Sequence, residues 1–219
     1  MSGEVKKADL LGVERVYDEI GLQPEIDICQ YAHASAFKLL EHEYNVTGSI
    51  CAFQRSLSGG GSMADTATPA DGVEVAETRD VEQFVNASIE GFRSGGRSTE
   101  LLGLLAKAAA QRNDTTLFVA KVNGEVAGTA SVAYVDASGT KFANLYIDST
   151  LPRFREKGVH RALIAARLAA AARNGCEVAI ASARSDSISA RSIEKAGFER
   201  VFSSSTYTRV ATRRRHAAV

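Results

Sequence analysis

A cluster of basic residues surrounds a glycine in the C-terminal half of the chain. Its members are Arg153, Arg155, Lys157, Gly158, His160 and Arg161. An apolar run precedes the cluster, and a long alanine-rich stretch with helical spacing follows it. The first amide N–H groups of a helix lack partners within the helix and carry partial positive charge, so this junction would bind an anion, best of all a phosphate or pyrophosphate. Basic residues at a helix start are often merely solvated, but the apolar run, the glycine and the alanine-rich helix together favour the anion site.

The elements that must position this cluster lie on either side of it. The segment 140–150 reads as a strand, and the helix that follows Gly158 ends at Gly175. Residues 176–183 form an apolar run, which is typical of a buried strand, and the helical connection makes this strand parallel to the previous one. A last helix should begin near Ser187.

Upstream, the pattern predicts a strand, two helices and two further strands. The strand begins at Val73, Asp80 caps the first helix, and Ser98 opens the second. Asn123 and Gly124 then join two strands in a two-residue hairpin, because both residues tolerate positive φ. With the strand before the basic cluster, these make three antiparallel strands. A terminal hairpin is expected after the last helix.

The order of these elements and the segment RFREKGVHRAL resemble the GNAT N-acetyltransferase family over residues 73–210. The family signature is Arg or Gln, two residues, Gly, one residue, then Gly or Ala. Here Arg155 and Gly158 match the signature, and His160 departs from it. The resemblance implies an α/β fold in which a mixed, splayed sheet of six or seven strands is flanked by helices.

The resemblance also implies that acetyl-CoA is the acetyl donor, with no metal. The loop expected to hold its pyrophosphate comprises Arg153, Arg155, Glu156, Lys157, Gly158, Val159, His160 and Arg161. The backbone at Thr150 and Leu151 should line the acetyl and pantetheine arm, where the two parallel strands separate. Ser189 and Ser192 are expected to cap the last helix or to contact CoA.

Acyl transfer to an amine also needs one group that accepts a proton and one that returns a proton to the thiolate. Asp148 is the candidate base, although it equally fits a solvated or capping aspartate at a strand end. The usual donor in the family is a Tyr four residues before the Gly-Phe pair that ends the last helix. This position is Ile193, which a Schellman ending would pack against Phe198. The remaining candidates for the donor are Tyr146, Tyr207, Ser189, Ser192 and water, and Tyr146 equally fits core packing.

The N-terminal residues echo the C-terminal ones. Laid on 175–209 without a gap, residues 21–55 place Gly21 on Gly175 and Ser35 on Ser189, in the same order of predicted elements. The expected organisation is a partial, degenerate GNAT-like half at 1–57, a flexible linker at 58–72, the GNAT domain at 73–210 and a basic tail at 211–219.

Composition narrows the classes of function. The 219 residues carry 26 basic and 26 acidic side chains, which disfavours nucleic acid as a partner. No stretch reaches the roughly 18 apolar residues of a membrane span. Three cysteines without metal-ligand spacing suggest a reduced, cytoplasmic protein without disulfides. A homodimer is left open.

The sequence thus predicts an N-acetyltransferase that moves an acetyl group from acetyl-CoA directly to a primary amine of a small molecule or peptide. Cys176 lies past the helix, away from the loop, and is not expected to carry the acyl group. The alternative is a CoA-binding or interaction module that has lost catalysis, suggested by Ile193 and by the incomplete first half. A nucleic-acid-binding role for the arginine-rich tail is a third, weaker alternative.

Overall fold

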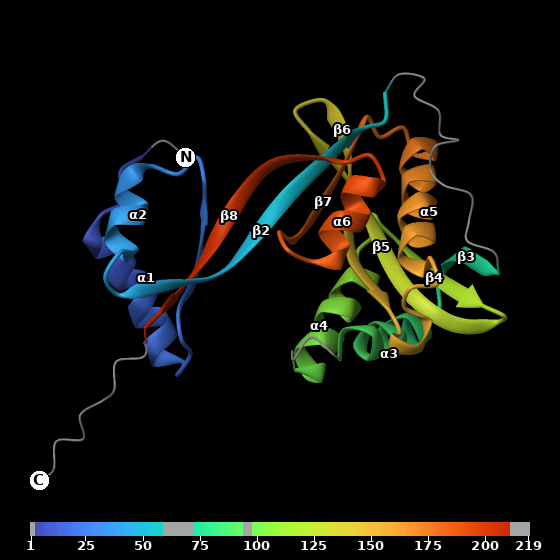
Figure 1. The fold of residues 1–219 in the computed structure, drawn as a ribbon, viewed down its shortest axis with the longest axis horizontal. Coiled ribbons are helices and arrows are strands. Elements are labelled where there is room, and N and C mark those ends of the chain that lie inside the picture. The colour runs from blue at the N-terminus through green and yellow to red at the C-terminus, as the bar shows by residue number, and fades with distance from the viewer. Residues whose placement is uncertain (1–2, 59–71, 94–97, 211–219) are drawn as a thin grey trace, which may run out of the picture. The chain divides into compact units, whose positions relative to one another are not determined.

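The computed structural model of the protein describes residues 3–58, 72–93 and 98–210 (Figure 1). In chain order the elements are α1 (Lys7–Glu19), β1 (Glu25–Cys29), α2 (Ala34–Leu40), β2 (Tyr44–Ser56), β3 (Val73–Thr78), α3 (Val81–Phe92), α4 (Thr99–Ala110), β4 (Thr115–Val122), β5 (Glu125–Ala137), β6 (Thr140–Thr150), the 3-10 helix η3 (Pro152–Phe154), α5 (Val159–Arg173), β7 (Val178–Arg184), α6 (Ile188–Lys195) and β8 (Glu199–Arg209). None of the described helices is both long enough and apolar enough to cross a membrane.

The strands are hydrogen-bonded in the order β1-β8-β2-β7-β6-β5-β4-β3. Strands β4 to β6 pair antiparallel, and β6 and β7 pair parallel, as the sequence predicts. Strand β3 pairs antiparallel with β4. The predicted fold class, a mixed sheet flanked by helices, is confirmed. The contacts divide the chain into a larger unit, residues 52–182 and 187–200, and a smaller unit formed by the remaining residues.

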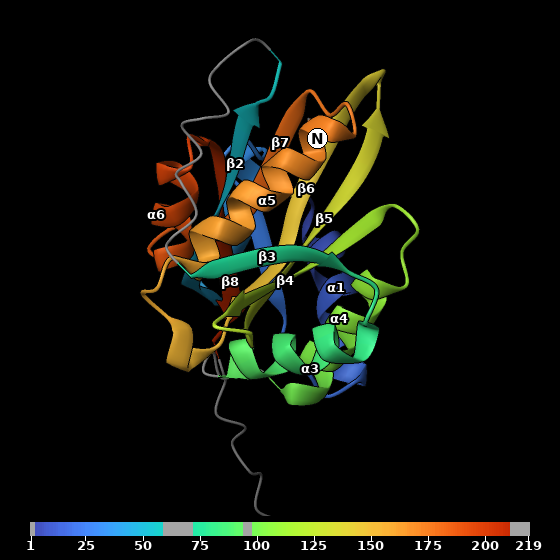
Figure 2. The same ribbon diagram turned by 90° about the vertical axis from the view of Figure 1, so that its right-hand side faces the viewer.

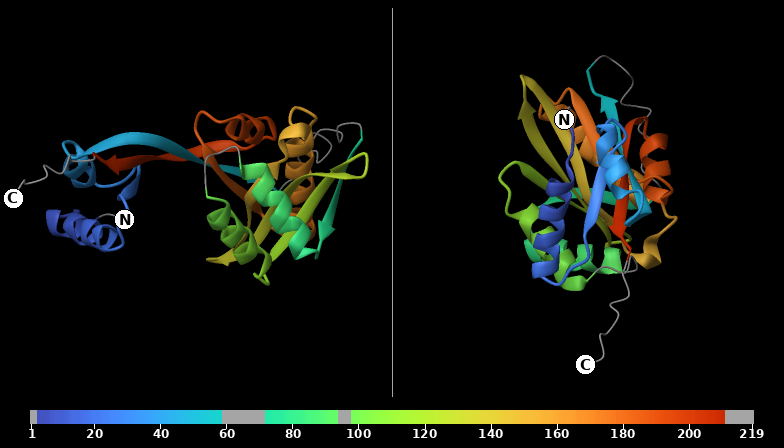
Figure 3. Two further views of the ribbon diagram at one scale, coloured as in Figure 1. Left: turned by 90° about the horizontal axis from the view of Figure 1, so that it is seen from below. Right: turned by 90° about the vertical axis from the view of Figure 1, so that its left-hand side faces the viewer.

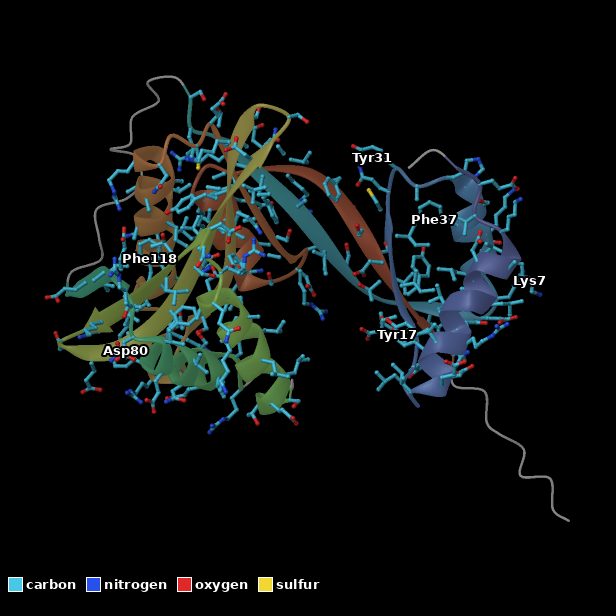
Figure 4. The ribbon with its side chains drawn as sticks, turned by 180° about the vertical axis from the view of Figure 1, so that it is seen from behind. Lys7, Tyr17, Tyr31, Phe37, Asp80 and Phe118 are labelled. Atoms are coloured by element: carbon cyan, nitrogen blue, oxygen red, sulfur yellow. The ribbon has the colours of Figure 1, made fainter. Side chains whose placement is uncertain are left out.

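Local signals placed most element boundaries of the larger unit correctly. The Asp80 carboxylate accepts a hydrogen bond from the Gln83 amide at 2.9 Å and so caps α3 (Figure 4). Ser98 and Ser187 cap α4 and α6 in the same way, by accepting from the amide three residues on. Asn123 and Gly124 adopt φ of 51° and 81°, which is the primed hairpin expected between β4 and β5.

Two adjacent residues of β5 show which helix covers which face of this sheet. A Cβ added at Gly128 would lie 2.9 Å from Val159 and 3.2 Å from Leu163, both in α5. The next residue, Thr129, hydrogen-bonds through its hydroxyl to Ser88 of α3 at 2.8 Å. Successive side chains of a strand point to opposite faces, so α5 covers one face, and α3 with its neighbour α4 covers the other (Figure 2).

The smaller unit packs α1 and α2 beside β1 (Figure 3). Its core contains Ile28, Ala36, Leu40 and Tyr44, with Phe37 on the β1 side of α2 (Figure 4). The buried Glu14 accepts a hydrogen bond from the Tyr44 hydroxyl at 3.0 Å, and burial together with this carboxylate raises the pKa of Tyr44. An apolar hollow of about 430 Å³ lies among α1, β1 and α2.

One expectation about the strands was wrong. The terminal hairpin is a single strand, β8, because the run from Glu199 to Arg209 contains no turn and takes its antiparallel partner β1 from the N-terminal residues. Residues 73–210 supply six strands, within the expected six or seven, and β1 and β2 bring the hydrogen-bonded order to eight. Residues 59–71 of the predicted linker at 58–72, and the basic tail at 211–219, lie outside the described residues.

Replacing Gly128 with Ala is predicted to destabilise the larger unit by about 1–3 kcal/mol. The added Cβ would lie 2.6 Å from the backbone oxygen of Ser149, and neither the strand nor α5 can yield without loss of packing. Urea denaturation followed by circular dichroism would measure the loss.

The matched control is Gly12→Ala in α1. An added Cβ there meets nothing within 4 Å, and alanine favours a helix interior, so stability should hold or rise. Equal stability of Gly128→Ala and the wild type would contradict the close approach of α5 to β5.

Candidate functional site

Strands β6 and β7 separate part-way along their length. Their parallel pairing runs from Phe142 opposite Val178 to Leu145 opposite Ala181, and β6 then continues to Thr150. Just after the last pair, β6 gains one residue relative to β5, which is a β-bulge. The sheet therefore opens at the carboxyl ends of two parallel strands, as the sequence predicted.

The bulge is centred on Ile147, whose φ of 45° is unusual for a β-branched residue. Its side chain packs against the buried cluster formed by α3, α4 and β4, which holds it in place. Beyond it, the Ser149 hydroxyl bonds to Thr129 on the α3 side at 3.0 Å. Asp148 instead meets side chains of α5. The bulge thus determines on which face of the sheet each side chain of this strand end lies.

The loop that joins β6 to α5 is anchored at its start. The Leu151 amide donates to the Ala127 carbonyl at 2.9 Å, and Leu151 and Phe154 are both buried. Arg153 and Lys157 lie over the Phe154 ring, with their charged groups 4.9 and 5.3 Å from the ring centroid. The apolar residues fix the loop, and the basic groups stay at its surface.

The backbone of the loop is shaped to present amide groups. Glu156 and Gly158 have φ of 65° and 78°, whereas Arg155 has φ of −62°. Alternation of this kind turns successive N–H groups into a concave cradle for an anion. The first intrahelical bond runs from the Ala162 amide to the Gly158 carbonyl, so the amides of residues 159–161 add to the cradle.

Three ionisable side chains meet beside this cradle. Asp148 Oδ2 accepts from Arg167 Nη2 at 2.9 Å and lies 2.7 Å from His160 Nε2. The Arg167 side chain is only 1% exposed, whereas those of His160 and Asp148 are each 23% exposed. Arg167 also donates to the carbonyls of Leu163 and Ser131. The cluster ties the first and third turns of α5 to the bulged end of β6.

The environment of Asp148 keeps its carboxyl ionised. Burial raises its pKa, but the charge of Arg167 and the hydrogen bond and charge of His160 outweigh burial and hold the pKa far below its ordinary value. A carboxylate of this kind accepts a proton poorly near neutral pH. Its surroundings therefore argue against the base that the sequence suggested and favour a structural or orienting part for Asp148.

The other candidate proton donors lie in β6, β8 and α6. The Tyr146 hydroxyl is 2.8 Å from that of Thr115, and Tyr207 pairs with Ile26 in the smaller unit. The Ser192 hydroxyl donates to the Ile188 carbonyl of its own helix, and Ser189 lies one turn earlier in α6.

The end of α6 confirms the Schellman ending. The Phe198 amide bonds to the Ile193 carbonyl at 3.3 Å and the Gly197 amide to the Glu194 carbonyl at 2.9 Å. Both Ile193 and Phe198 are 4% exposed, so the residue in the usual donor position is a core side chain.

The basic side chains of the loop point toward acceptors of α3 and its surroundings. Arg153 lies 3.5 Å from both Glu90 and Glu125, in exposed pairs of little energetic weight. Arg155 donates to the Gly91 carbonyl at 3.5 Å. Thr150 is the second paired residue after the bulge and lies opposite Gly128.

Sequence reasoning missed Arg167 as part of the site. The signal was present, because His160 and Arg167 are seven residues apart and share a stripe on α5. What the sequence did not show is that this stripe faces the sheet, where Asp148 supplies the counter-charge.

The comparisons with known proteins agree with this geometry. Residues 82–198 match the model of the acetyltransferase (GNAT) family. The chain belongs to the GNAT family. Its enzyme class is therefore that of the acyltransferases, and the matched region contains the bulge, the anion cradle and the ionisable cluster. No curated protein matches the sequence.

Solved GNAT and related structures share the fold at low identity. A conserved protein of unknown function from Staphylococcus epidermidis has a TM-score of 0.68 at 11% identity, covering 95% of this chain and 82% of its own. A GCN5-related N-acetyltransferase from Sphaerobacter thermophilus gives 0.67 at 17%, covering 91% and 65%. A tandem GNAT protein of the clavulanic acid pathway gives 0.66 at 12%, covering 92% and 68%. The tandem protein fits a fold with two related halves.

Replacing Asp148 with Asn is predicted to lower the free energy of unfolding at pH 7 by about 3 kcal/mol, because it leaves the buried Arg167 guanidinium without a counter-charge. The matched control is Glu77→Gln, which makes the same change opposite Arg173 in a pair 2.8 Å apart but exposed by 54% and 62%. This control should cost less than about 1 kcal/mol. Equal losses in the two variants would contradict the anchoring role of Arg167.

The stability difference between wild type and Asp148→Asn should also depend on pH. Because folding lowers the pKa of Asp148, its carboxylate stabilises the protein fully above the unfolded-state pKa of about 4, and this contribution fades as pH falls through the folded-state pKa. The difference in unfolding free energy between wild type and Asp148→Asn should be complete at pH 7 and shrink below about pH 4. A difference that grows on acidification would contradict the assignment.

Proposed function

We propose that the protein is an N-acetyltransferase that moves an acetyl group from acetyl-CoA directly to a primary amine of a small molecule or peptide. One observation carries the proposal: the anion cradle at Glu156–Arg161 lies at the end of the strand that parts from β7. The cradle suits a diphosphate, and the opened strand end offers Thr150 and Leu151 backbone beside it for an extended thioester arm. The remaining loop residues, Arg153, Arg155 and Lys157, supply positive charge to the phosphates.

Direct transfer is favoured over an acyl-enzyme. Cys176 is buried, and burial raises the pKa of its thiol, so little thiolate is available at neutral pH. Cys51 is also buried, and Cys29 belongs to the smaller unit. An amine that attacks the thioester directly needs none of these groups.

The alternative is a CoA-binding module without catalysis. It is favoured by one observation, the burial of Ile193 where the family usually carries a tyrosine. The two proposals differ in whether the protein transfers the acetyl group, and both require it to bind CoA.

The deciding experiment incubates the protein with acetyl-CoA and a panel of primary amines while free thiol is monitored. Amine-dependent thiol release, together with thermal stabilisation by CoA, is expected. Stabilisation by CoA without release across a wide pH range would favour the inactive module. If CoA does not stabilise the protein and no thiol is released, both proposals are overturned.

The cradle can be tested separately with Gly158→Ala. Alanine at a φ of 78° is strained by about 1 kcal/mol, and the loop relieves this strain by turning its amides, so CoA affinity should fall by about fivefold to tenfold. The matched control is Gly139→Ala, because Gly139 has φ of 79° in the turn between β5 and β6. Calorimetric titration with CoA should show wild-type affinity for the control, and equal affinities for all three proteins would contradict the cradle.

A further inference from the structure

A histidine stands where the family signature carries Gly or Ala, and a hydrogen bond holds its ring in place. His160 is the second residue of α5, and its Nε2 lies 2.7 Å from Asp148 Oδ2. The same oxygen accepts from the buried Arg167. The ring is thus turned from the anion cradle toward the bulged end of β6.

The bond to Asp148 decides the tautomer of a neutral His160 ring. An ionised carboxylate can only accept hydrogen bonds, so Nε2 must carry the proton. The lone pair of the neutral ring then resides on Nδ1. Within the described part of the chain, Nδ1 has no hydrogen-bond partner, and the side chain is 23% exposed. The arrangement leaves one basic nitrogen open.

The contact with Asp148 places the His160 ring beside the opened strand end. Asp148 lies beyond the last β6–β7 pair at Leu145, in the part of β6 that has separated from its neighbour. Thr150 follows two residues later, where the thioester arm is proposed to lie. His160 therefore lies between the cradle for the phosphates and the strand end that would hold the acyl group.

We infer that His160 is the proton acceptor for the amine, with Asp148 as the residue that positions its ring. This inference rests on the proposed function. His160 takes one proton from the incoming ammonium group, which frees the lone pair on nitrogen. The nitrogen–carbon bond to the acetyl carbon forms and the carbon–sulfur bond breaks. The departing thiolate receives the second nitrogen proton, and His160 releases the first to solvent.

Two charged groups are linked to the ring, one directly and one through a shared carboxylate oxygen. Asp148 faces it from β6, and Arg167 of α5 faces the same carboxylate oxygen. Lys157 and Arg161 lie beside His160 along the chain.

The first test compares His160→Gln with wild type for turnover and for CoA binding by calorimetry. Loss of a positioned base should lower kcat by about 100-fold or more and abolish the acidic limb of the pH profile, while CoA affinity changes by less than about threefold. Wild-type kcat and pH profile in this variant would overturn the inference. Absence of turnover in the wild type itself would show instead that the proposed function has failed.

The second test uses His160→Ala, which restores a small residue of the family pattern. If the ring accepts the proton, kcat falls and added imidazole raises it again in a saturable way. If the ring is only a structural link, added imidazole has no effect on kcat. If the ring is an obstruction, kcat is unchanged or higher in the variant. Either result overturns the inference.

The positioning role of Asp148 has its own readout. In Asp148→Asn, assayed well below its unfolding temperature, the ring loses the carboxylate that orients it. The value of kcat should then fall while CoA affinity stays at its wild-type value. An unchanged kcat would show that Asp148 acts only on stability.

Discussion

The buried guanidinium of Arg167 is the group around which the site is built. It reaches from α5 to the Ser131 carbonyl of β5 and the Asp148 carboxylate of β6, and its ε nitrogen returns to the Leu163 carbonyl of its own helix. A buried cation is tolerated only when its donors and charge are matched, so both strands must hold their positions for the helix to pack. The same contact fixes Asp148, and through Asp148 it fixes the His160 ring. Stability of the fold and orientation of the site therefore depend on one ion pair.

The opening of the sheet depends on a second constraint, the close approach of helices at two glycines. Gly128 lets α5 rest on β5, and Gly91 lets α3 approach β6 so closely that an added Cβ would lie 2.4 Å from the Ser149 hydroxyl. With β6 held from both faces, the strain of Ile147 at a φ of 45° is supported by packing instead of being relieved. The bulge then directs Asp148 to the α5 side and Ser149 to the α3 side. A flat, regularly paired β6 would have neither the separation from β7 nor this division of side chains.

Features set by a few neighbouring residues were the ones that the sequence predicted well. The caps at Asp80 and Ser98, the Asn123–Gly124 hairpin and the Schellman ending at Gly197 each need only local chemistry. The bulge at Ile147 could not be foreseen, because isoleucine disfavours positive φ and only packing against residues distant in the chain imposes it. For the same reason the sequence showed the spacing of His160 and Arg167 without revealing their partner. It left Asp148 as either a candidate base or a solvated or capping aspartate.

The smaller unit repeats the order of the elements that follow the anion loop. Under the constant offset that places Gly21 on Gly175, its elements α1, β1, α2 and β2 fall on α5, β7, α6 and β8 within about two residues. The offset places Val13 on Arg167 and Val16 on Ala170, yet the two valines are 41% and 57% exposed, whereas Arg167 and Ala170 are 1% and 0% exposed. The larger unit covers this helix face with β5 and β6, and within the described residues the smaller unit has no counterpart of those strands. Without a strand end facing the helix, a charged residue at position 13 would have no carboxylate partner. The same offset places Glu4 on Gly158 of the anion cradle. The same order of elements thus leaves this helix face exposed in the smaller unit and buries it against β5 and β6 in the larger one.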